Sequence, residues 1–110
     1  MIAKKPSIFI YSNGAGENYL KEICAGIEEE GVFYEISERE SDQPDRLAFE
    51  AARDSMLGSG IGVSKEGVVL QMRGLRQEEP VEGCCLPTKE ECRRIGANSA
   101  RIIKRMALKE

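Results

Sequence analysis

The sequence contains no histidine and no tryptophan, and aromatic residues make up only 5% of its 110 positions. Without histidine there is no imidazole base, no Ser-His-Asp or Cys-His nucleophilic pair and no histidine ligand for zinc. No apolar run approaches 18 residues, so we expect no membrane-spanning segment. Residues 1–6 also lack the apolar stretch of a signal peptide. These absences exclude whole classes of enzyme and favour a cytoplasmic protein.

An excess of basic residues is missing as well. The 16 Lys and Arg residues stand against 19 Asp and Glu residues, which gives a net charge of −3. This balance argues against a nucleic-acid-binding surface. The four cysteines, at positions 24, 84, 85 and 92, form no C-x-x-C pair and match no zinc-site spacing. We interpret them as small apolar residues in a reducing compartment.

What the sequence does contain is a regular succession of apolar patterns. Strand-like runs lie at residues 7–12, 32–38, around 61–63, at 68–72 and, more weakly, at 83–86. Helical periodicity is present in three segments. The first ends at residues 28–30, the second begins at residues 41–45 and ends near Ser55, and the third begins at residues 87–91 and ends at Met106. This order predicts a single three-layer α/β domain over residues 1–110, with a mixed β-sheet flanked by helices.

The last predicted helix carries two clear local signals. Thr88 and Glu91 have the spacing of a capping box at its start. Its apolar stripe is formed by Cys92, Ile95, Ser99, Ile102 and Met106. The neighbouring positions Gly96, Ala97 and Ala100 are small. We therefore expect another element to approach this helix closely.

Two sites are typical of anion binding. The turn at residues 13–16, Asn-Gly-Ala-Gly, lies between a strand and a helix, where phosphates often bind. However, Tyr19 replaces the third glycine of a dinucleotide fingerprint, and no Gly-Lys-Ser/Thr run is present. A plain turn explains this segment better. The basic residues of the last helix are Arg93, Arg94, Arg101, Lys104 and Arg105. A solvated face with favourable dipole charges accounts for most of them, and an anion-binding or partner-binding face is the alternative.

The run Glu28-Glu29-Glu30 is unusual because carboxylates at the end of a helix oppose its dipole. Three interpretations stay open from the residues alone. The run is a solvated helix end, or it pairs with a basic partner, or one carboxylate binds a hard cation such as Mg²⁺.

A family resemblance begins at this run. Residues 26–32, Gly-Ile-Glu-Glu-Glu-Gly-Val, resemble a signature of the small subunit of diol/glycerol dehydratase reactivases. Residues 51–55 and 60–63 resemble the family's Ala-Ala-Arg stretch and the strand after it. Residues 96–101, Gly-Ala-Asn-Ser-Ala-Arg, resemble its closing element. The resemblance spans residues 7–105, nearly the whole chain.

This resemblance implies a fold like one domain of the dehydratase medium subunit. It also implies a large ATPase partner subunit that binds ADP or ATP, whereas this chain binds no nucleotide and is not an enzyme. The middle glutamate of the run, Glu29, would be a ligand of Mg²⁺ at the interface with that large subunit. Glu28, Glu30 and Arg101 are the expected neighbours in the interface.

The function that follows is accessory. The complex would release damaged cobalamin from adenosylcobalamin-dependent diol or glycerol dehydratase, through subunit exchange with the dehydratase medium subunit. The dehydratase would be a transient partner, and the compartment the cytoplasm, with association with a bacterial microcompartment left open. One alternative is a medium-subunit-like component of the dehydratase itself. Another is a small-molecule-binding module that uses the turn at 13–16.

Overall fold

The computed structural model describes residues 5–14, 17–105 and 108–109. Its elements are β1 (Ile8–Asn13), α1 (Glu17–Glu29), β2 (Tyr34–Glu38), α2 (Pro44–Asp54), β3 (Ser59–Ser64), β4 (Gly67–Met72), β5 (Glu82–Cys84) and α3 (Lys89–Lys104). Their order is the predicted one. The expected α/β domain with a mixed sheet is confirmed.

The five strands form one sheet in the order β2-β1-β3-β4-β5. β1 pairs in parallel with β2 and with β3, because α1 and α2 each carry the chain back to the starting edge. β3 and β4 pair in antiparallel fashion through a tight turn, and β5 continues this pattern. The chain therefore begins as two βαβ crossovers and continues as a meander.

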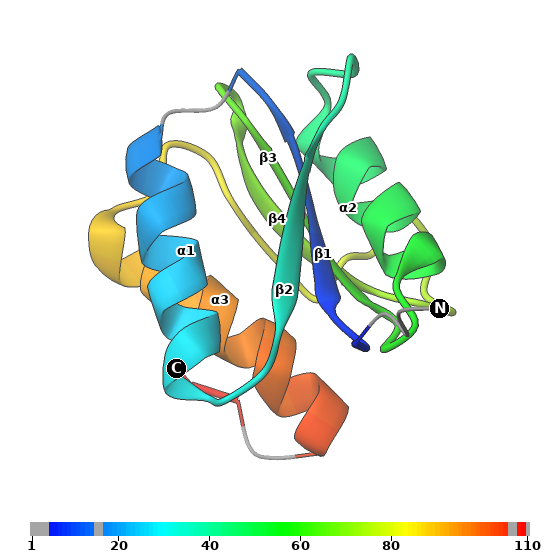
Figure 1. The fold of residues 1–110 in the computed structure, drawn as a ribbon. Helices are drawn as coiled ribbons and strands as arrows, with labels where there is room; N and C mark the ends of the chain where they lie inside the picture. Colours follow the sequence, from blue (N-terminus) through cyan, green and yellow to red (C-terminus); the bar gives the residue numbers. More distant parts are fainter. Residues whose placement is uncertain (1–4, 15–16, 106–107, 110) are drawn as a thin grey trace.

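Helices cover both faces of this sheet (Figure 1). α1 and α3 pack side by side on one face, and α2 lies on the other. The main core lies between the sheet and the α1–α3 pair, and its largest members include Ile10, Ile27, Ile61 and Ile95. A smaller cluster of Tyr11, Leu47 and Ala51 lies under α2. The larger core thus joins the first and the last helix.

The fifth strand differs from its predicted position at 83–86. It pairs with β4 only from Leu70↔Glu82 to Val68↔Cys84. Leu86 lies outside the strand, with a φ of 48° and 75% exposure, because the chain turns there toward the start of α3. Met106, the last member of the predicted stripe, lies outside the described residues. Within the described ranges, no helix is long and apolar enough to cross a bilayer.

Candidate functional site

The predicted glutamate run lies where α1 ends. Glu28 and Glu29 belong to the last turn of the helix, and Glu30 and Gly31 form the turn that follows. Gly31 has a φ of 75°, which favours glycine and ends the helix directly after the predicted end at 28–30. Lys104 of α3 donates a hydrogen bond to the carbonyl oxygen of Glu30. A cation from another helix therefore offsets part of the dipole conflict at this end.

The Glu30 carboxylate faces α3 and is held by two cations. Its Oε2 accepts a hydrogen bond from Nε of Arg101 at 3.2 Å, and its Oε1 lies 3.6 Å from Nζ of Lys104. The Glu30 side chain is only 10% exposed. Glu30 and Arg101, both expected at a partner interface, thus meet each other inside this chain.

Glu28 and Glu29 are the exposed members of the run. Oε1 of Glu28 accepts a hydrogen bond from the Tyr34 hydroxyl at 2.8 Å. That bond, with burial second, raises the pKa of Tyr34 above its ordinary value. Oε1 of Glu29 lies 3.6 Å from Nε of Arg93, and both side chains are half exposed. Such an exposed ion pair contributes at most about 1 kcal/mol to stability. A group that binds the Glu29 carboxylate more strongly can therefore displace Arg93.

The chemistry of this donor set fits a shared metal site. No group of three or more potential ligands gathers anywhere in the part of the chain that the structure describes. Mg²⁺ binds through one or two protein carboxylates and completes its octahedron with water or other oxygens. Glu29 offers one such carboxylate on the surface, whereas the Glu30 carboxylate is engaged by Arg101 and Lys104. The remaining ligands would have to come from water or from a partner.

Two of the segments that carry the family resemblance, residues 26–32 and 96–101, meet at the crossing of α1 and α3. A Cβ at Gly26 would lie 2.2 Å from the carbonyl oxygen of Arg93. A Cβ at Gly96 would lie 2.1 Å from the carbonyl oxygen of Ile23. Each helix therefore requires a glycine where the other crosses it. The close approach expected at the small residues of α3 is made by α1.

Most basic residues of α3 pair with acidic residues of this chain, although Arg93, Lys104 and Arg105 are exposed. Arg93 pairs with Glu22 and Glu29 of α1, and Arg94 pairs with Glu82 of β5 at 2.8 Å. Arg105 adopts the left-handed conformation that caps the helix. Together with the Glu30 pairs, these contacts attach α3 to its neighbours by charge.

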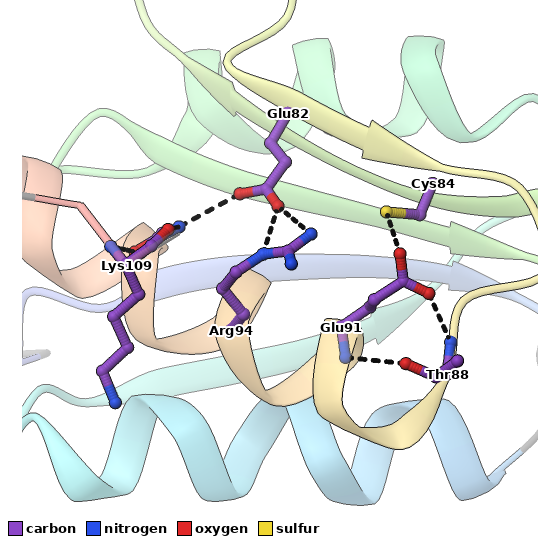
Figure 2. Close-up of polar contacts among 7 residues, drawn as sticks. Glu82, Cys84, Thr88, Glu91, Arg94 and Lys109 are labelled. Carbon is purple, nitrogen blue, oxygen red and sulfur yellow. Dashed lines mark hydrogen bonds and ion pairs between the residues drawn. The ribbon is translucent and has the colours of Figure 1, made fainter.

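A polar network that the sequence reasoning missed joins α3 to β5 (Figure 2). Asn98 is 1% exposed, and its side-chain amide donates to Oε1 of Glu82 at 3.1 Å and to the carbonyl oxygen of Lys109 at 3.2 Å. Its Oδ1 accepts the backbone N–H of Lys109 at 2.8 Å. The sequence signal that could have predicted this network was an asparagine, Asn98, on the buried face of the last helix. The asparagine of the closing motif thus has a structural role here.

The predicted capping box is present at the other end of this network. The Thr88 hydroxyl accepts the backbone N–H of Glu91, and the Glu91 carboxylate accepts the backbone N–H of Thr88 at 2.9 Å. That backbone bond, with a weaker one from the Cys84 thiol, lowers the pKa of Glu91. The local sequence signal therefore located the start of α3 correctly.

All four cysteines are free thiols. Cys24 and Cys92 are buried, in agreement with the interpretation as small apolar residues, and burial raises the pKa of Cys92 to about 11. Cys84 is half-buried. Cys85 is exposed, which departs from that interpretation.

At the end of β1, the predicted turn has a structural task. The Asn13 side-chain amide donates to the carbonyl oxygens of Arg39 and Glu40, at 2.6 and 2.9 Å. These bonds link the end of β1 to the loop after β2. Residues 15 and 16 of the turn lie outside the described residues, so the expected plain turn and its alternative, phosphate binding, are both untested there.

Comparisons with known proteins agree on one family. The family model described as dehydratase medium subunit matches residues 5–109. The propanediol dehydratase-reactivating factor small subunit of Citrobacter freundii is 32% identical over 106 residues, which cover 96% of this chain and 91% of that protein.

Two solved structures share the fold along nearly the whole chain. A diol dehydratase-reactivating factor complexed with ADP and Mg²⁺ matches with a TM-score of 0.89 and 25% identity, over 97% of this chain and 100% of that one. A glycerol dehydratase reactivase matches with a TM-score of 0.91 and 26% identity, over 96% and 98%. The resemblance read from the sequence is confirmed.

Proposed function

The chain belongs to the dehydratase medium subunit family, and we propose that it is the small, non-catalytic subunit of a diol or glycerol dehydratase reactivase. The observation that carries this proposal is that the matches extend over almost the full length of the relatives. The relative named as a reactivating-factor small subunit is covered over 91% of its length, and a chain of the reactivating-factor structure over 100%. Residues 1–110 then act as one small-subunit domain.

The proposed partner is a large subunit that binds and hydrolyses ATP. The matched reactivating-factor complex was solved with ADP and Mg²⁺, which supports a nucleotide and a metal in such assemblies. We assign Glu29 as this chain's ligand to Mg²⁺ at the subunit interface, because its carboxylate is exposed and weakly paired. Glu28 would lie beside it. Glu30 and Arg101, bound to each other, would hold the helix end in place.

The proposed action is subunit exchange in the cytoplasm. This chain belongs to a family named for the dehydratase medium subunit, so both proteins would present the same fold to the large reactivase subunit. The nucleotide state would then select between the two pairings through differential affinity. Exchange would open the dehydratase, release the damaged cobalamin and let intact coenzyme enter. Association with a microcompartment would be a further property of the same complex.

A binding measurement with the large subunit tests this proposal. The two subunits are mixed with Mg²⁺ and ADP, and their affinity is measured by calorimetry for the native chain and for Glu29→Ala. We expect Glu29→Ala and EDTA each to weaken binding at least tenfold, which corresponds to about 1.4 kcal/mol.

The matched control is Glu66→Ala. Glu66 is exposed in the turn after β3, whose end lies beside the end of β1 and so at the opposite end of the sheet from Gly31. The Glu66→Ala variant should bind the large subunit with the same affinity as the native chain. No binding of the native chain would refute the proposal, and equal losses for both variants would refute the role of Glu29.

The second candidate function is a medium-subunit-like component of the dehydratase itself, favoured by the name of the matching family. That function predicts stable co-purification with the dehydratase large subunit and binding of a corrinoid by the assembly. Absorbance of bound cobalamin after gel filtration distinguishes the two functions. A reactivase subunit carries none.

A further inference from the structure

β2 forms an open edge of the sheet. It pairs only with β1, in the register that sets Ile36 opposite Ile10. The backbone groups on its other side have no strand partner within the described residues. Unpaired edges of this kind accept added strands from other chains.

An apolar groove of about 500 Å³ runs beside this edge, between β2 and α1. It is lined by Leu20, Cys24, Tyr34 and Ile36, with Lys21 and Glu28 among its polar residues. Ile36 lies at the middle of the strand, yet it is 47% exposed, and Phe33 just before the strand is 54% exposed. Ile10, the residue of β1 opposite Ile36, is fully buried. Nζ of Lys5 lies 4.5 Å from the centroid of the Phe33 ring, so Ile36 is the apolar side chain that the edge leaves most open.

The groove carries charges of both signs, Lys21 and Glu28, and β2 itself adds two further carboxylates. Glu35 and Glu38 of β2 are exposed, and no ion pair within the described ranges engages either carboxylate. A second copy of this chain paired along β2 would bring four such carboxylates together, which is unfavourable. Basic side chains on the added segment would instead be attracted.

We propose that the open edge of β2 and this groove receive an extended segment of the large subunit as a sixth strand. Side chains alternate between the faces of a strand. Apolar residues of the segment would therefore fill the groove against Leu20 and Ile36, and basic residues between them would face Glu35. β2 has five residues, so a segment of about five residues, roughly 17 Å long, matches it.

This inference rests on the proposed function and extends its interface. Glu28 lines the groove and directly precedes Glu29 in the chain. The metal contact and the strand contact would thus be adjacent parts of one surface at the end of α1.

The test uses the full chain and the large subunit with Mg²⁺ and ADP. Ile36→Lys should weaken binding at least tenfold, because a cation would enter the apolar groove. Met56→Lys is the matched control, since Met56 is 69% exposed in the loop after α2, and it should bind within twofold of the native chain. Thermal melting confirms that both variants are folded.

Hydrogen–deuterium exchange on the native complex provides an independent measurement. Amides of β2 should exchange at least tenfold more slowly in the complex than in the free chain, as a paired strand requires. If the native complex forms but β2 exchange is unchanged, the inference is overturned and the proposed function stands. If no complex forms, both fail together.

Discussion

At the scale of single residues, Asn98 shows how a buried polar group is satisfied. Its amide makes hydrogen bonds to the Glu82 carboxylate and to both backbone groups of Lys109. Glu82 is in turn held by Arg94 at 2.8 Å. One buried side chain therefore holds both β5 and the backbone of Lys109.

Replacing this amide should be costly. Asn98→Ala removes three hydrogen bonds made by a buried side chain, so we expect a loss of about 2 kcal/mol in the free energy of unfolding, measured by urea denaturation. Asn98→Asp should lose at least as much at pH 7, because it sets a carboxylate beside Glu82. Gln43→Ala is the control, since the exposed Gln43 makes no capping hydrogen bond. An unfolding curve for Asn98→Ala that matches this control would contradict the network.

At the scale of elements, the crossing of α1 and α3 depends on backbone contact. Gly96→Ala would improve intrinsic helix propensity by about 1 kcal/mol. We nevertheless expect it to destabilise the protein by about 3 kcal/mol or more, because the added Cβ meets the carbonyl oxygen of Ile23 at 2.1 Å. Chemical denaturation measures the change.

Gly83→Ala serves as the control for this crossing. Its nearest contact would be 3.5 Å from a Val69 methyl, an ordinary van der Waals distance. It should change the unfolding free energy by less than about 1 kcal/mol. A Gly96→Ala protein as stable as Gly83→Ala would show that the helices can move apart without loss.

The capping box of α3 gives a prediction about pH. Thr88→Ala should lower the unfolding free energy by about 1 kcal/mol, and Thr88→Ser should restore most of it. The pKa of Glu91 is lowered in the folded chain, chiefly by the backbone hydrogen bond from Thr88. Its stabilising effect is therefore complete above the ordinary pKa of a glutamate and is lost as the pH falls through the lowered value.

Thermal melting of Glu91→Gln between pH 7 and pH 2 checks the sign of this effect. The native chain should be more stable than the variant at pH 7, and the difference should shrink below about pH 4. If the difference in stability stays constant down to pH 2, the Glu91 carboxylate does not contribute to the loss of stability in acid.

At the scale of the whole molecule, subunit exchange predicts competition. The native chain, labelled with a fluorophore on the exposed Cys85, is bound to the large reactivase subunit, and dehydratase medium subunit is then added. We expect the medium subunit to release the labelled chain, and the concentration of medium subunit that is needed should differ between ATP and ADP. Gel filtration with fluorescence detection measures the released fraction. Retention at a hundredfold excess of competitor with both nucleotides would exclude exchange.

Local signals predicted much of this molecule. The helix end at residues 28–30 and the capping box at Thr88 each depend on neighbouring residues, and each is present. The fifth strand was misplaced because its three residues depend on pairing with β4 rather than on their own pattern.

The candidate site was predicted only in part, because it depends on distant contacts. The glutamate run was recognised, but the partners of each carboxylate were not. Glu30 and Arg101 lie 71 positions apart, and no periodicity relates them. The open edge of β2 was missed for the same reason, since strand order is not encoded in any single segment.

The packing of α1 against α3 also has a consequence for how the protein is made. Ribosomes add about 5 to 20 residues per second, so α1 emerges on the order of ten seconds before the helix that covers it. During that interval Ile23 and Ile27, both fully buried in the finished protein, lack their cover. The nascent chain is then exposed to chaperones and aggregation. Since Arg101 belongs to α3 and holds Glu30, the end of α1 reaches its final structure only after α3 has been synthesised.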